Sequence, residues 1–256
     1  MTMTRRSSLI LGAGAAAAAL VVRPGAASAR SAAQSYPVEG GDLVVQPVEH
    51  ASLVLTAPGM VIYADPVGGA GLYEGLPPAG LILITHEHQD HFDVPTLEAL
   101  AADGTRLLTN PSVFDKLPAG LKERATAIAN GESTTANALA IEAIPAYNTT
   151  PDRLKYHPQG RDNGYVLTIG GARIYVAGDT EDIPEMRALE DIAIAFVPMN
   201  LPYTMTVEQA AAGVAAFAPA RVYPYHHRDS DLQAFARLVK ESGAPTEVIL
   251  AGWYPA

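Results

Sequence analysis

Residues 85–91 read Thr-His-Glu-His-Gln-Asp-His and hold three of the seven histidines in this chain of 256 residues. The stretch directly follows the apolar run Leu81–Ile84, which predicts a loop at the end of a buried strand. His86 and His88 are two positions apart, so in an extended backbone both rings point the same way. Asp90 and His91 then turn toward a second point nearby. Imidazole and carboxylate groups in such a cluster predict a site for Zn²⁺, Mn²⁺ or Fe²⁺.

The composition restricts which chemistry can serve this site. The chain contains no cysteine, so disulfides, thiolate zinc sites, iron–sulfur clusters and cysteine nucleophiles are excluded. The net charge is −10, from 17 Lys and Arg against 27 Asp and Glu, which argues against nucleic acid or an anionic membrane as the main partner. An apolar fraction of 48% predicts a full-sized core. We expect a small-molecule substrate and a metal held by histidine and carboxylate alone.

The first 29 residues are typical of an export signal. Arg5 and Arg6 precede an alanine-rich apolar run over residues 9–22, and residues 27–29 form an Ala-Ser-Ala cleavage pattern. The run is shorter than the roughly 20 residues that span a bilayer. The paired arginines resemble a twin-arginine signal, although Ser8 replaces the usual phenylalanine. We expect a periplasmic or secreted protein, cleaved near residue 30 and not inserted in the membrane. An uncleaved N-terminal anchor is the alternative.

Residues 37–256 contain no linker or repeat that would divide them, so the sequence predicts one domain, residues 30–256, after the signal. Residues 30–36 are expected to be a short polar lead-in. The expected strands are residues 42–47, 51–56, 61–64, 81–85, 106–109, 125–128, 139–146, 164–169, 172–177, 192–198, 221–225 and 247–250. The first four of these are separated by Gly/Pro turns, as in an antiparallel meander. The expected helices are residues 94–103, 112–117, 184–189, 206–217 and 231–242. Strands covered by helices in two similar halves indicate an α/β sandwich of four layers, αββα.

The motif at residues 86–91 resembles that of the metallo-β-lactamase-fold hydrolases, whose His-x-His-x-Asp-His pattern is intact here. The resemblance covers about residues 40–250 and is closest to the branch of the L-ascorbate-6-phosphate lactonase-like proteins. Further segments support it in the expected order: residues 145–148, 157–160, 178–186, 202–205 and 224–226. The resemblance implies an αββα metallo-β-lactamase sandwich with two divalent metal ions between its halves, most often zinc, with manganese or iron as alternatives.

The resemblance also implies a role for each residue of the motif. His86 and His88 would bind the first metal, and Asp90 and His91 the second. Asp179 resembles the carboxylate that bridges both ions. The alternative for Asp179 is an acidic turn residue before a helix.

Two ligand positions are open between alternatives. His226 resembles the last ligand of the second metal, and its competitor is His227. Because neighbouring strand residues point to opposite faces, only one of this pair can face the site, and we expect His227 to be a surface or substrate-facing residue. Asn148 stands where many relatives have the third ligand of the first metal. His157 resembles its replacement, with Asn148 as a weak ligand or substrate contact, or water, as alternatives.

Other polar residues near strand ends are candidates for lining the site. His50 and Asp65 resemble residues that line it or orient a ligand, and the alternative is a surface histidine and a turn-capping aspartate. Loop residues form a set of candidate substrate contacts: Tyr203, Asn200, Arg161, Asn163 and Arg228. Glu87 and Gln89 fill the variable motif positions and are expected to be structural, and Trp253 is expected to pack at the C-terminus.

Such a centre implies hydrolysis. A metal pair lowers the pKa of a water between the ions, and the hydroxide attacks a carbonyl or phosphorus atom. Asp90 and Asp179 are the expected catalytic residues, and Asp90 could orient the nucleophile and receive a proton. We therefore expect an exported metal-dependent hydrolase acting on an ester, lactone or phosphodiester. The alternatives are a β-lactam hydrolase, an iron-dependent oxidoreductase and a metal-binding protein without turnover.

Overall fold

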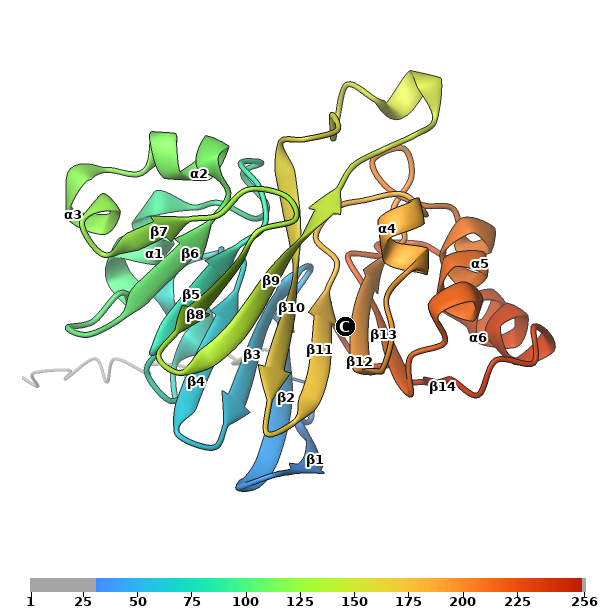
Figure 1. Ribbon diagram of the computed structural model, residues 1–256, viewed down its shortest axis with the longest axis horizontal. Helices are drawn as coiled ribbons and strands as arrows, with labels where there is room; N and C mark the ends of the chain where they lie inside the picture. The colour runs from blue at the N-terminus through green and yellow to red at the C-terminus, as the bar shows by residue number, and fades with distance from the viewer. Residues whose placement is uncertain (1–30, 255–256) are drawn as a thin grey trace, which may run out of the picture.

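The computed structural model describes residues 31–254, and the expected export signal lies outside them. These residues form two seven-stranded sheets that face each other (Figure 1). The first sheet has the order β1 (Gln34–Val38), β2 (Gly41–Glu49), β3 (Ser52–Ala57), β4 (Met60–Ala64), β5 (Leu81–Ile84), β6 (Arg106–Thr109) and β7 (Ala125–Ala127). The second has the order β14 (Glu247–Val248), β13 (Arg221–Tyr225), β12 (Ile192–Pro198), β11 (Ala172–Val176), β10 (Asp162–Ile169), β9 (Leu139–Ala146) and β8 (Ser133–Ala136).

Helices cover the outer face of each sheet, which confirms the αββα sandwich (Figure 1). The helices on the first sheet are α1 (Val94–Leu100), α2 (Pro111–Lys116) and α3 (Ala119–Lys122), and those on the second are α4 (Pro184–Arg187), α5 (Val207–Phe217) and α6 (Leu232–Glu241). Two 3-10 helices lie in loops, η1 (Ala70–Tyr73) and η2 (Pro151–Arg153). The largest apolar cluster lies between the sheets and includes Leu55, Tyr165 and Trp253, so Trp253 packs in the core as expected. Every residue of β5 is buried, because both faces of this strand are covered.

Local sequence signals set the helix ends. Thr206 caps α5, since its hydroxyl accepts the N–H of Gln209 and the Gln209 side chain accepts the N–H of Thr206. Asp231 caps α6 by accepting the N–H of Ala234 at 2.9 Å. These caps explain why the expected ranges 206–217 and 231–242 lie within one residue of the observed helices.

Two expectations about the strands and helices are wrong, and two further elements were not expected. The expected lead-in is wrong, because residues 34–38 form β1, which pairs with β2. The two further elements are β8 and the short helix α3. β1 and β8 each lie at the edge of a sheet and are half exposed, so their sequences contain no apolar run that marks a strand.

The expected antiparallel meander ends at β4, because β5, β6 and β7 pair in parallel. The connections that precede β6 and β7 contain helices, which allows the crossover that parallel pairing needs.

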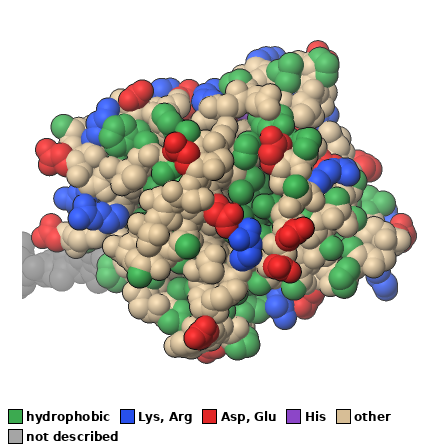
Figure 2. All heavy atoms as spheres, viewed as in Figure 1, with side chains coloured by type: hydrophobic (Ala, Val, Ile, Leu, Met, Phe, Trp, Pro, Cys, Tyr) green, Lys and Arg blue, Asp and Glu red, His purple; other side chains and the backbone are tan. Residues whose placement is uncertain are grey.

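The surface gives no sign of a single dominant patch on the face that Figure 2 shows. There, acidic and basic side chains interleave. Within residues 31–254, every helix is too short or too polar to cross a bilayer.

Polar loops from both sheets meet at one edge of the sandwich. β5 ends directly before the motif at residues 85–91, β11 ends shortly before Asp179, and β13 ends directly before His226. Two backbone hydrogen bonds join the sheets here: the N–H of Asn163 donates to Thr85 at 3.0 Å, and the N–H of His226 donates to His50 at 2.9 Å. The candidate residues therefore share one rigid edge.

Gly178 holds the turn between β11 and Asp179 in a conformation that needs glycine. Its φ is +66°, and a Cβ there would lie 2.8 Å from the Asn163 carbonyl oxygen and 3.1 Å from the Thr85 Cβ. Both neighbours belong to the backbone junction of the two sheets. A side chain at this position would therefore push that junction apart.

We predict that Gly178→Ala destabilises the metal-free protein more than Gly171→Ala does. Gly171 has φ +76° and open space around its Cβ position, so it isolates the left-handed backbone cost of about 1–2 kcal/mol. Gly178→Ala adds the clash, and we expect a further loss of about 1 kcal/mol or more. Urea unfolding monitored by far-UV circular dichroism measures both. Equal losses would contradict the packing argument.

Candidate metal centre

Three histidines form the first donor group. His86, His88 and His157 each present a ring nitrogen, and these atoms lie within 4.8 Å of one another. His86 Nε2 is 3.1 Å from His88 Nδ1. His86 and His88 come from the loop after β5, whereas His157 comes from the long loop between β9 and β10, at the top of Figure 1. The two sheets therefore both contribute to this group.

Asp179 lies between this group and a second one. Its Oδ2 is 3.4 Å from His157 Nε2 and 3.9 Å from His86 Nε2. The same Oδ2 is 3.3 Å from His226 Nε2, and Oδ1 is 3.4 Å from His91 Nε2. Only 3% of the Asp179 side chain is exposed. One buried carboxylate thus faces histidines on both sides, an arrangement that favours a bridging role over that of an acidic turn residue before a helix.

The second donor group contains His50, Asp90, His91 and His226, with ligand atoms within 4.8 Å of one another. Asp90 Oδ2 lies 3.5 Å from His226 Nε2 and 3.2 Å from His50 Nε2. The Asp90 side chain is 46% exposed, unlike the buried rings around it. Asp90 therefore connects the buried cluster to solvent.

Several buried atoms of the cluster lack a hydrogen-bond partner among the described residues. They are Nε2 of His91 and His157, both ring nitrogens of His226 and Oδ1 of Asp179. Leaving such an atom unpaired costs about 1–3 kcal/mol, so the arrangement needs a compensating group. Donor atoms on one tetrahedral zinc ion, at about 2.1 Å from it, lie about 3.4 Å apart, close to the separations found here. The donor set therefore fits divalent metal ions.

Outer partners fix the orientation of the rings. Asp65 is fully buried and lies 2.7 Å from His91 Nδ1, and it also accepts hydrogen bonds from the backbone and hydroxyl of Thr85. Asp162 lies 3.1 Å from His157 Nδ1. A carboxylate on the far nitrogen of a ring is the usual partner of a metal-binding histidine. The interpretation of Asp65 as an orienting residue agrees with these contacts, and the capping alternative does not.

The charges within the cluster stabilise one another. Burial would raise the pKa of Asp179, but His226 and His91 outweigh it and hold that pKa well below its usual range. Burial is likewise outweighed at Asp90, where the neighbouring His226 and His50 rings lower the pKa. At His91 burial lowers the pKa, whereas Asp179 and Asp65 raise it, to about 9. Burial keeps the pKa of His86 well below its usual value. The carboxylates are therefore ionised at neutral pH, as metal binding requires.

The contacts of Asn148 and His157 indicate which of the two belongs to the first donor group. The Asn148 amide donates to the carbonyl oxygens of Arg153 and Tyr203, at 3.1 and 2.7 Å, and so ties two loops together. His157, in contrast, lies with His86 and His88. The geometry favours His157 as the third donor and Asn148 as a loop anchor.

His226 faces the cluster, whereas His227 does not take part in either donor group. His227 is not a surface residue, because its ring is buried and its Nδ1 contacts the Arg228 carbonyl oxygen at 3.0 Å, and a substrate-facing role for it stays a prediction. The reason is that β13 ends at Tyr225 and the chain turns at His226, whose φ is +46°. His50 is also buried, so its surface alternative is wrong.

A cleft of about 520 Å³ opens onto the cluster. Its lining includes Tyr203, Asn200 and Arg228 from the candidate substrate contacts, and Glu87 and Gln89 from the motif. The other two candidates do not line it: Arg161 pairs with Asp162 at 2.7 Å, and the buried Asn163 amide donates to Ile128 at 2.8 Å. Glu87 pairs with Lys116 at 2.7 Å, in line with its expected structural role.

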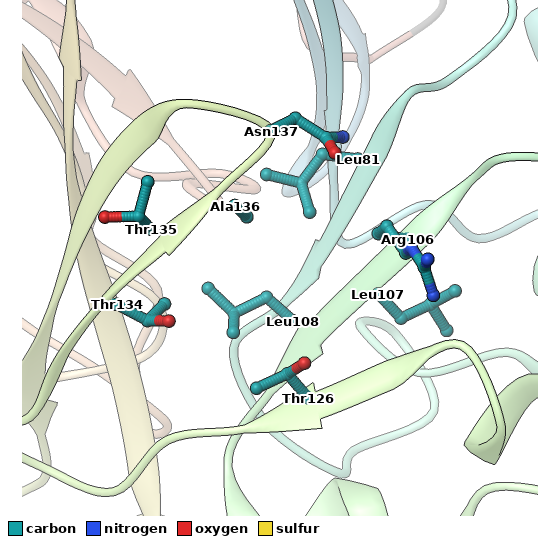
Figure 3. A pocket seen from close by; sticks show the side chains of 9 residues that line it. All are labelled: Leu81, Arg106, Leu107, Leu108, Thr126, Thr134, Thr135, Ala136 and Asn137. Carbon is teal, nitrogen blue, oxygen red and sulfur yellow. The ribbon is translucent and has the colours of Figure 1, made fainter.

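A second cavity, of about 250 Å³, lies between the facing sheet edges (Figure 3). Leucines of β5 and β6 and threonines of β7 and β8 line it, and Arg106 is the one titratable side chain in its wall. Because no catalytic group converges there, the cleft at the histidine cluster is the candidate active site.

Glu181 fixes the loop that carries His157. Its buried carboxylate accepts the N–H groups of Thr149 and Thr150, at 2.6 and 2.7 Å, and pairs with Arg153 at 2.6 Å. The Arg153 guanidinium also reaches the Thr204 carbonyl oxygen at 3.1 Å. Sequence reasoning missed this network, because nothing in the local pattern around Glu181 indicates which loop it contacts.

Comparisons with known proteins agree with this geometry. Residues 44–226 match the family described as "Beta-lactamase superfamily domain". A crystal structure from Parabacteroides distasonis, described as a metal-dependent hydrolase, is 42% identical, with a TM-score of 0.78 over 85% of this chain and 98% of the other. A "UPF0173 metal-dependent hydrolase" of Thermococcus onnurineus is 30% identical over 67% of this chain and 78% of its own. One of the same name from Thermus thermophilus is 29% identical over 79% and 94%.

We predict that His91 titrates near pH 9 in the metal-free protein and that Asp65→Asn lowers this pKa. NMR of the imidazole protons measures both values. Because the raised pKa belongs to the folded state, its stabilising contribution is complete below about pH 6.5 and is lost as pH rises toward 9. The free energy of unfolding of the metal-free protein should therefore fall over this range more steeply than that of Asp65→Asn. Identical titrations of His91 in both proteins would contradict the role of Asp65, and His227 serves as the internal control.

Proposed function

We propose that this chain, which belongs to the family described as "Beta-lactamase superfamily domain", is an exported hydrolase with two metal ions that share Asp179 as a ligand. The fold is that of the metallo-β-lactamases, and the three relatives described above all carry the name metal-dependent hydrolase. The observation that carries the proposal is the position of Asp179. Its two carboxylate oxygens face donors of both groups, at 3.3 to 3.9 Å.

The two donor groups divide the ligands between two ions. His86, His88 and His157 would hold the first. Asp90, His91 and His226 would hold the second, with Asp179 shared. When bound, two such ions lower the pKa of a water and stabilise negative charge on a substrate oxygen.

The chain's own residues supply the rest of the site. Asp90 is ionised and half exposed at the cleft, so it can orient a water and accept its proton. Arg228 and Tyr203 are exposed on the cleft wall and can contact the substrate. Among the residues that line the cleft, none is a serine or threonine, so the wall offers no hydroxyl of this kind as a nucleophile. These features support attack by water on an ester, lactone or phosphodiester.

Export rests on the N-terminal sequence. Arg5 and Arg6, the apolar run that follows and the Ala-Ser-Ala pattern at residues 27–29 support translocation by a twin-arginine route. This route carries folded proteins, so a metal site built across both sheets could be loaded before export.

We predict that His88→Ala and Asp179→Ala abolish hydrolysis and metal retention while keeping most secondary structure. A panel of carboxylic esters, lactones and phosphodiesters, assayed with added Zn²⁺ or Mn²⁺, measures the activity, and circular dichroism measures folding. Asp152→Ala, at an exposed position in η2, is the matched control and should behave as the wild type. Turnover at the wild-type rate in both site variants would contradict the assignment.

We predict that replacing Arg5 and Arg6 together with lysine retains the full chain in the cytoplasm. The lysines keep the positive charge and remove only the paired-arginine signal. Fractionation of a bacterial host, with the unmodified chain as the reference, measures the distribution. Unchanged export would contradict the twin-arginine route, and cytoplasmic retention of the unmodified chain would contradict export.

A further inference from the structure

His50 occupies an unusual backbone position at the turn between β2 and β3. Its φ is +53°, in the left-handed region that most side chains avoid. Its N–H donates to Trp253 at 3.1 Å, and its carbonyl oxygen accepts the N–H of His226 at 2.9 Å. The backbone is therefore held on both sides, and the side chain is only 6% exposed. Strained positions of this kind persist where surrounding contacts fix them, and they cluster at functional sites.

The His50 ring points its two nitrogens at different kinds of partner. Nδ1 lies 2.7 Å from the Tyr254 hydroxyl, outside the cluster. Nε2 lies 3.2 Å from Asp90 Oδ2, and the ring centroid is 3.8 Å from that of His226. His91 and His157 are arranged in a related way, with Asp65 and Asp162 on Nδ1 and an unpartnered Nε2 turned toward Asp179, whereas His50 has a hydroxyl on Nδ1 and Asp90 beside Nε2. An outer partner on one ring nitrogen, with the other nitrogen turned toward the cluster, is typical of metal-binding histidines.

We propose that His50 is a further ligand of the second metal. This inference rests on the two-metal site proposed above. The second ion would then be held by the set His50, Asp90, His91, Asp179 and His226. The first ion would be held by four side chains in place of five, the set His86, His88, His157 and Asp179. We infer that the second ion dissociates more slowly and that His50 accounts for this difference.

A competing role for His50 is to donate a hydrogen bond to Asp90 without touching a metal. The two roles need different tautomers, because a ligating Nε2 carries no proton whereas a donating Nε2 does. Tyr254 is compatible with either, since a hydroxyl can both donate and accept. His50→Gln separates the roles: glutamine can still donate to Asp90 but is a poor metal ligand.

The test uses the metal-free protein reloaded with Co²⁺ alone. Each imidazole bound to Co²⁺ gives a strongly shifted N–H resonance in the proton NMR spectrum. We expect His50→Gln to lose one such resonance and to bind one of its two Co²⁺ ions at least about tenfold more weakly. Asp152→Ala, at an exposed position in η2, is the control and should leave the spectrum and both affinities unchanged. A full set of shifted resonances in His50→Gln would overturn the proposal.

A second variant covers the case in which His50→Gln does not fold. Tyr254→Phe removes the partner of Nδ1 and leaves the ring in place. If His50 is a ligand, its shifted N–H resonance should exchange faster with water and broaden in this variant, while the others persist. If no resonance changes, His50 is not a ligand. Failure of the wild type to bind two Co²⁺ ions would instead overturn the two-metal site, so the two failures are distinguishable.

Discussion

The site depends on the burial of one carboxylate between two sheets. Burying a charged group costs several kcal/mol unless opposite charges and hydrogen bonds compensate it. Asp179 is 3% exposed and lies among rings from both halves, His86 and His91 on the first sheet side and His157 and His226 on the second. The carboxylate is stable there only if both sheets place their loops at the same edge. The site therefore forms only when the sandwich is assembled.

The backbone around this edge is strained in a consistent way. His50, Asp65 and His226 all have left-handed φ values, and Gly178 joins them next to Asp179. Each such non-glycine residue costs of order 1 kcal/mol or more. The hydrogen bonds between the sheets and the Asp65 contacts to Thr85 and His91 compensate part of that cost. This strain turns each side chain away from the alternation of its strand and toward the cluster.

Much of the fold and of the candidate site could be predicted from the sequence. The features that could not be predicted depend on tertiary contacts. The spacing within residues 85–91 predicts donors directly, since the motif is local. The αββα sandwich follows from the order of strands and helices, but β1 and β8 are polar edge strands with no apolar signal. The buried position of His227 follows from the turn at His226, which strand alternation does not anticipate. His50 contacts groups 40 and 176 residues further along the chain, so no local pattern could assign it to the second group.

Two metal ions that share Asp179 can be located directly. The most direct measurement is a crystal structure of the protein purified without chelators or a histidine tag, with anomalous scattering recorded at the absorption edge of the metal found by elemental analysis. We expect two anomalous peaks per chain, one beside His86, His88 and His157 and one beside His91 and His226. A single peak, or none after Zn²⁺ and Mn²⁺ have been added back, would contradict it.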